Sequence, residues 1–187
     1  MKRAFSRLLV GAGIFLMASL PALGAQVYLL EAEAPRAIFP DSTTSARKVL
    51  ELSDTEQAAL AKVLDRKVEV RNYAYLEVRN DKGPIGVIFM LDVIGQSQPI
   101  AFAVGVRPDG ALQDVQVMVY REPQGEAIQE RRFRKQFTGK RLTDPITLGK
   151  DIDAISGATI SARSATYAAR KGLALAQVVR ARAGGTP

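Results

Sequence analysis

Apolar and polar residues alternate through the middle of the chain, which is the pattern of half-buried β-strands. Short turns rich in Gly and Pro separate the alternating segments, at 82–84, 95–99 and 108–110. Consecutive strands joined by such short turns pair antiparallel. The pattern therefore predicts an antiparallel meander, with strands that cover 73–78, 85–94, 100–106 and 112–120.

The last of these strands indicates which residues face the core. Three valines alternate there with three other residues: Val115, Val117 and Val119 against Asp114, Gln116 and Met118. Because successive side chains of a strand point to opposite faces of the sheet, we expect all three valines on one buried face.

Helical patterns precede the sheet. The segment 33–40 predicts a short helix, with Pro35 in its first turn and Pro40 at its end. Ser53 and Glu56 have the spacing of a capping box, in which each side chain bonds the backbone N–H of the other residue. We expect a helix from there to about residue 66 and a short strand just before it, at 49–52.

Two further helices are expected in the last third of the chain. A basic one covers 126–137, and an Ala-rich one covers 161–182 with Ala168, Leu175 and Val179 among its buried residues. These elements together predict an α+β fold, an antiparallel sheet meander with packed helices.

The N-terminus has the three-part pattern of an export signal. Basic residues within the first seven positions precede an uncharged apolar run, 8–20, and Ala22 and Gly24 supply the small residues of a cleavage site. We expect residues 1–24 to be removed as a signal peptide. Retention as a membrane anchor is the alternative, because the uncharged stretch is long enough to cross a bilayer. Either route predicts a periplasmic location or the outer face of the cytoplasmic membrane.

The rest of the chain divides into three parts. Residues 25–66 are predicted to form an N-terminal helical extension, 67–183 the main domain, and 184–187 a tail. The net charge of the chain is +7, and residues 1–24 contribute three basic residues and no acidic one to it. The basic composition is therefore a weak argument for nucleic-acid binding.

Cys and His are both absent from the 187 residues. The chain therefore has no disulfide, no thiolate or imidazole metal ligand and no Ser-His-Asp triad. A metal site would need oxygen ligands alone, and none is predicted. Any redox centre has to be an organic cofactor.

The most specific signal is the segment 153–161, Asp-Ala-Ile-Ser-Gly-Ala-Thr-Ile-Ser. Its small residues let a bulky ligand reach the backbone, and Gly157 permits a tight turn. The start of the following helix presents unpaired N–H groups and the positive end of its dipole. A phosphate suits this place, with the hydroxyl of Thr159 beside it. The structural alternative is a plain turn, with Thr159 or Ser161 as the helix cap.

This pattern, Asp-x-x-Ser/Thr-Gly-Ala-Thr, resembles the flavinylation motif of the FMN-binding domain family. That domain occurs in flavin-carrying subunits of the sodium-pumping NADH:quinone oxidoreductase and of the Rnf complex, and in small exported proteins. In the family, a flavin transferase uses FAD to attach FMN through its phosphate to the threonine hydroxyl. The resemblance implies Thr159 as the attachment residue, within a motif completed by Asp153, Ser156, Gly157 and Ala158.

Segments upstream of the motif extend the resemblance over about 73–175. The loop from Glu122 to Gly125 is similar to the family's Glu-x-x-Gly loop, and 136–140 is similar to its Gln-Phe-x-Gly-Lys segment. The resemblance implies that Glu122 and Gly125 contact the cofactor, although Glu122 also suits a solvated loop. Lys150 and Lys140 are candidates to neutralise the flavin phosphate or to favour reduced anionic flavin, and each also suits a solvated surface. Four aromatic residues are candidates for stacking on the flavin, although each also suits the core: Tyr120, Phe133, Phe137 and Tyr167.

The resemblance implies an exported electron carrier without catalytic residues, whose partners are a flavin transferase and a membrane or exported redox protein. Two other functions stay open: a flavin-dependent reductase of a small acceptor, and a basic module that docks on a membrane redox complex. The basic run 131–135 is either a solvated helix face or a docking face for an acidic partner or an anionic membrane surface. Nucleic acid is not an expected partner.

Overall fold

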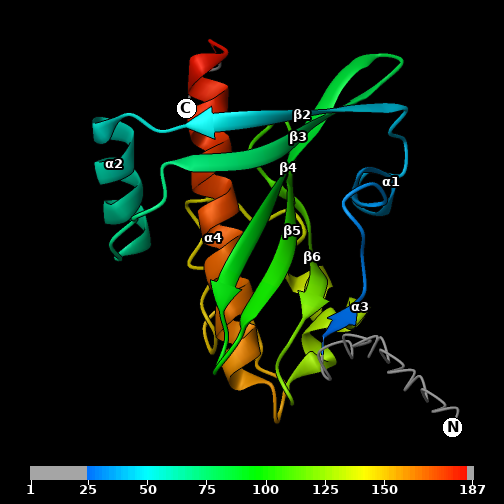
Figure 1. Cartoon of the computed structure of the whole chain (residues 1–187), viewed down its shortest axis with the longest axis vertical. Helices are drawn as coiled ribbons and strands as arrows, with labels where there is room; N and C mark the ends of the chain where they lie inside the picture. The colour runs from blue at the N-terminus through cyan, green and yellow to red at the C-terminus, as the bar shows by residue number, and fades with distance from the viewer. Residues whose placement is uncertain (1–24, 185–187) are drawn as a thin grey trace, which may run out of the picture.

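The computed structural model describes residues 25–184 (Figure 1). Within them, six strands form one antiparallel sheet in the order β1-β6-β5-β4-β3-β2. The strands are β1 (Gln26–Val27), β2 (Thr44–Glu51), β3 (Asn72–Asn80), β4 (Gly83–Ile94), β5 (Pro99–Val106) and β6 (Leu112–Tyr120). The predicted α+β class and the meander from β3 to β6 are confirmed. The predicted signal segment, 1–24, and residues 185–187 of the predicted tail lie outside the described residues.

One face of the sheet is covered by the long helix α4 (Thr159–Arg182), which runs along β4, β5 and β6 in Figure 1. Its buried face consists mainly of alanines with Leu173 and Leu175, so the helix comes close to the sheet. Helix α2 (Asp54–Leu64) packs against α4. The main core lies between these helices and the sheet, where Phe89 and Phe102 are fully buried.

The opposite face carries a smaller core under the short helix α1 (Ala34–Ile38). Ile38 and Phe39 pack there in one cluster with Val78 of β3 and Ile88 of β4. Both faces of the sheet are therefore covered, which explains why the middle strands are apolar on both sides. No helix among residues 25–184 is long and apolar enough to cross a membrane.

The segment 25–66 contains the two expected helices and also supplies both edge strands of the sheet. β1 pairs with β6, and β2 pairs with β3 over its whole length. The short strand expected at 49–52 is therefore longer and begins earlier, at Thr44. Every residue of β2 except Leu50 is exposed, so this edge strand has no alternating pattern by which it could be recognised.

Two sequence expectations are wrong in detail. Val119 does not share a face with Val115 and Val117, because Met118 has no partner on β5 and the register shifts there. Val119 packs in the smaller core instead.

The basic helix expected at 126–137 is broken into three short pieces: a 3₁₀ turn at Glu126–Gln129, α3 (Arg131–Arg134), and a 3₁₀ turn at Lys135–Phe137. Ile128, Phe133 and Phe137 are all buried. A single helix would place Ile128 on a different side from the two phenylalanines, because their spacings do not fit one helical face.

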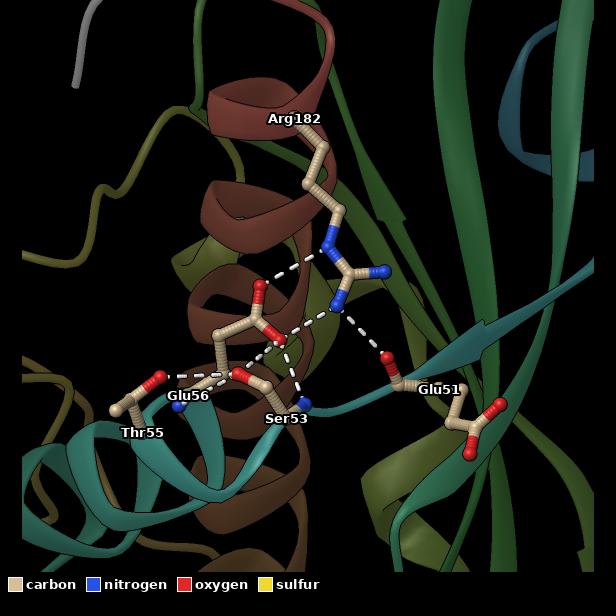
Figure 2. Close-up of polar contacts among 5 residues, drawn as sticks. All are labelled: Glu51, Ser53, Thr55, Glu56 and Arg182. Carbon is tan, nitrogen blue, oxygen red and sulfur yellow. Dashed lines mark hydrogen bonds and ion pairs between the residues drawn. The ribbon is translucent and has the colours of Figure 1, made fainter.

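The C-terminal end of α4 is joined to α2 by an ion pair (Figure 2). The Arg182 guanidinium contacts the Glu56 carboxylate twice, at 2.9 Å and 2.5 Å, and donates to the Glu51 carbonyl oxygen at 2.7 Å. The same carboxylate accepts the Ser53 N–H at 2.8 Å, which completes the predicted capping box. One side chain therefore caps α2 and ties it to α4.

Candidate functional site

The segment 153–158 is a loop that ends where α4 begins. Its last residues form a tight turn, in which the Ala158 N–H donates to the Ile155 carbonyl oxygen at 3.0 Å. Gly157 has a φ of 77°, the left-handed conformation that a type II turn requires at this position. A Cβ at Gly157 would meet no atom within 4 Å. The loop therefore exposes its backbone to open space.

No side chain caps the first turn of α4. Ala158 is the N-cap residue and has no side-chain cap bond, so the alternative in which Thr159 or Ser161 caps the helix is wrong. Ser161 is buried, with its hydroxyl 2.8 Å from the Tyr120 hydroxyl. Thr159 is exposed and its side chain makes no hydrogen bond with the described residues. Its hydroxyl therefore lies beside backbone N–H groups that have no partner within the helix.

A cavity of about 240 Å³ adjoins Thr159. One side is the start of α4, from Gly157 to Ser161, and the other consists of Gln96, Glu122 and Gln124. The fold thus brings Glu122 to the motif, as the sequence implied. The cavity is smaller than the ~300–1,000 Å³ of sites that enclose a whole small molecule.

A second cavity, of about 340 Å³, lies along the preceding part of the loop. Asp153 and Ser156 line it, together with Arg132 and Gln136. The side-chain amide of Gln136 accepts the Asp153 N–H at 2.7 Å and fixes this part of the loop. The motif residues are therefore divided between two cavities, with Gly157, Ala158 and Thr159 at the first.

Glu122 is held by the turn between β4 and β5. Its carboxylate accepts the Ser97 N–H at 2.7 Å, the Gln98 N–H at 2.8 Å and the Ser97 hydroxyl at 2.9 Å. Burial is the largest single influence and raises the pKa of Glu122, but the bonds from Gln98 and Ser97 outweigh it, so the pKa is lowered. Gly95 makes the approach possible, since a Cβ there would lie 2.5 Å from the carboxylate. Glu122 is thus ionised and holds the turn between β4 and β5 at the cavity wall, and we call this arrangement the Glu122 clamp.

Gly125 packs against α4 and does not line the cavity. It has a φ of 98°, and a Cβ there would lie 2.5 Å from the Ser161 hydroxyl oxygen. The Tyr120 hydroxyl donates to the carbonyl oxygen of the neighbouring Gln124. These contacts fix the loop 122–125 on the start of α4, so Gly125 acts on the site through the position of its neighbours.

The two lysines do not meet at the site. Lys140 pairs with Asp151 at 2.9 Å, and both side chains are 20% exposed. The Asp151 carboxylate also accepts the N–H groups of Ile146 and Thr147, so Lys140 stabilises this loop. Lys150 is exposed and lines neither cavity.

The aromatic candidates lie mostly in the core. Tyr120, Phe133 and Phe137 are each at most 2% exposed, and the two phenylalanines pack edge to face with ring centres 5.3 Å apart. Tyr167 lies under the guanidinium of Arg66.

Sequence reasoning missed the glutamines that line the cavities, Gln96, Gln124 and Gln136, and the position of Arg132. Gln136 is a defined position of the Gln-Phe-x-Gly-Lys segment, so the resemblance could have identified it. Gln124 lies at a variable position of the Glu-x-x-Gly loop. Arg132 belongs to the basic run 131–135, where nothing in the sequence distinguishes it from the neighbouring basic residues.

Comparison with known proteins agrees with this geometry. Residues 95–174 match the family model of the FMN-binding domain. The crystal structure of Shewanella oneidensis NqrC is similar in fold, with a TM-score of 0.54 and 19% sequence identity, over 78% of this chain and 88% of that chain. No curated protein sequence matches the chain. The matched segment contains both sides of the cavity at Thr159.

Proposed function

We propose that the FMN-binding domain of this chain makes it an exported electron carrier, with FMN attached through its phosphate to Thr159. The observation that carries this proposal is the exposed Thr159 hydroxyl, which lies at the uncapped start of the 24-residue helix α4. Its redox partner would be a membrane or exported redox protein. The location would be the periplasm or the outer face of the cytoplasmic membrane.

The residues around Thr159 suit a phosphate ester. The first-turn N–H groups and the positive end of the helix dipole favour negative charge there. Gly157 and Ala158 place no large side chain beside the hydroxyl. The cavity does not enclose a whole cofactor, so we expect part of the FMN to lie at the surface. FMN supplies one- and two-electron chemistry when bound, and an accessible flavin suits a carrier.

In the proposal a second protein carries out the attachment, because the carboxylate in the cavity wall, Glu122, is already bound by the N–H groups of Ser97 and Gln98. In the proposed reaction, a flavin transferase supplies FMN from FAD. The Thr159 oxygen forms a bond to the phosphate next to the flavin, the bond between the two phosphates breaks, and AMP leaves. The hydroxyl proton is released. The Glu122 clamp and the Gln136 contact hold the loops on both sides of the motif while this occurs.

The test is the intact mass of protein that is co-expressed with a flavin transferase in an exporting host. We expect a gain equal to FMN less one water in the parent and in the control Thr138→Ala, which removes another exposed threonine. Thr159→Ala should fold but gain nothing. Flavin that stays bound to Thr159→Ala in a denaturing gel would refute the assignment.

The same experiment separates the other functions. A folded parent without the added mass, beside a flavinylated control protein, would favour a basic docking module. Steady turnover of a small acceptor by the flavinylated protein would favour a reductase. The mass also shows whether residues 1–24 are removed.

A further inference from the structure

A third hollow lies near the other end of α4, far from the motif. Its volume is about 400 Å³, within the range of ~300–1,000 Å³ that is typical of small-molecule sites. The last turns of α4 form one wall, and the ends of β3 and β5 with the start of β4 form the other. From Thr159 to Val179 the helix rises about 30 Å. We call this hollow the distal groove. It shares no lining residue with the two cavities at the motif.

The floor of the distal groove is apolar. Val106 and Ala176 are almost fully buried and form its base. Val87 and Val179 are partly buried, and Pro84 lies exposed at the edge. A hollow lined in this way removes apolar surface of a bound molecule from water, and each methylene group buried adds to the affinity. It therefore suits a flexible alkyl chain.

The rim of the distal groove is basic. Arg79, Arg107 and Arg180 line it, with Glu77 as the one acidic lining residue. The Glu77 carboxylate is already paired, with Lys48 at 2.5 Å and with Arg79 at 3.4 Å.

Behind the rim, Asp109 pairs with Arg107 at 3.3 Å and with Arg141 at 2.8 Å. Each of the two carboxylates, Glu77 and Asp109, is therefore shared by two cations. The surplus of positive charge favours an anionic group at the mouth of the groove.

We propose that the distal groove binds a long-chain carboxylate, with the alkyl chain on the floor and the carboxylate at Arg79 and Arg107. The apolar floor supplies affinity for the chain, and the guanidinium groups select the acid. The concave shape suits one free chain better than the flat surface of a bilayer. This site is independent of the proposed flavin, because it lies at the opposite end of α4.

Titration calorimetry of the purified protein with dodecanoate, below its micelle-forming concentration, tests this proposal. We expect saturable binding that weakens as salt is added, and no binding of dodecyltrimethylammonium, which has the same chain and a positive head. Arg107→Gln should weaken binding about five-fold, the effect of losing one charged contact at the carboxylate. Arg47→Gln, which removes an exposed arginine of β2 outside the groove, should leave it unchanged.

A second variant tests the floor. Val179→Asp places a negative charge on the partly exposed wall of α4 and should abolish dodecanoate binding, while the far-UV circular dichroism stays that of the parent. Absence of saturable binding to the parent would overturn the proposal, as would equal binding by Val179→Asp. Co-sedimentation with phosphatidylglycerol vesicles without dodecanoate binding would assign the basic rim to a membrane surface instead. None of these results depends on flavin attachment.

Discussion

Neutralising Glu56 is expected to destabilise the fold at neutral pH and to have no effect in strong acid. Glu56→Gln is the sharpest change, because glutamine also serves at this position of a capping box. The variant therefore keeps the cap of α2 and removes the charge that faces Arg182. Figure 2 shows that the carboxylate lies between the guanidinium of Arg182 and the backbone of Ser53.

The magnitude follows from the pKa of Glu56. The hydrogen bond from Arg182 is its largest influence, followed by that from the Ser53 backbone, and together they lower the pKa from 4.5 to about 2. A shift of this size corresponds to about 3.4 kcal/mol without screening. The Glu56 side chain is 25% exposed and Arg182 is 46% exposed, so solvent screening reduces the expected value to about 1–2 kcal/mol.

The sign of the pH dependence is fixed by the direction of the shift. The folded pKa lies below the unfolded one, so the contribution is complete above pH 4.5 and is lost as the pH falls through about 2. Urea unfolding, followed by circular dichroism at pH 7 and at pH 2, measures it. We expect Glu56→Gln to lose about 1–2 kcal/mol at pH 7 and to match the parent near pH 2.

The control is Glu69→Gln, which breaks a pair whose side chains are 85% and 74% exposed. It should leave the unfolding free energy unchanged, since such exposed pairs contribute little. An equal loss for Glu56→Gln at both pH values would refute the reasoning. So would an unchanged effect of Glu56→Gln when Arg182 has already been replaced by Gln.

Three further predictions concern other parts of the chain. Glu122→Gln should lower the unfolding free energy by about 1–2 kcal/mol, because the N–H groups of Ser97 and Gln98 lose their ionised acceptor. Urea unfolding measures this loss, and an unchanged midpoint would contradict the clamp. Gly157→Ala should cost about 1 kcal/mol through strain at its φ of 77°, with no steric clash, and a thermal melt beside Ala154→Gly would detect it. Burial lowers the pKa of Lys171, so its charge opposes folding below that pKa and the parent gains stability as the pH rises toward 10.5. Lys171→Met should therefore be more stable than the parent at pH 7, by up to about 1 kcal/mol, and the advantage should shrink at pH 10. The Lys171 ammonium lies 4.8 Å from the centre of the Tyr73 ring, so a loss of stability at pH 7 would show that this contact dominates.

The sequence predicted the elements whose side chains follow a regular period or a local motif. The central strands alternate, Ser53 and Glu56 form the capping box within four residues of each other, and Thr159 lies at the start of the last helix. The central strands, the capping box and the position of Thr159 at the start of α4 could therefore be predicted from neighbouring residues.

What the sequence could not reveal depends on contacts between distant residues. β2 is an edge strand without a buried face, and the shift at Met118 depends on pairing with β5. Lys140 has the residue type of a phosphate ligand, but its partner is Asp151, eleven positions further along the chain. The role of Glu122 depends on a turn that lies 25 residues earlier in the chain.

The sheet edges have a consequence for how the chain acquires its structure. β1 is the first strand of the described residues, but it pairs with the last strand, β6. The Glu56 carboxylate likewise pairs with an arginine that lies 126 residues further along the chain. Neither pairing can form before its C-terminal partner has been made, and contacts between such distant residues form slowly. If the chain is exported as we propose, the β1 edge of the sheet and the contact between α2 and α4 are completed only after β6 and the last helix have been made.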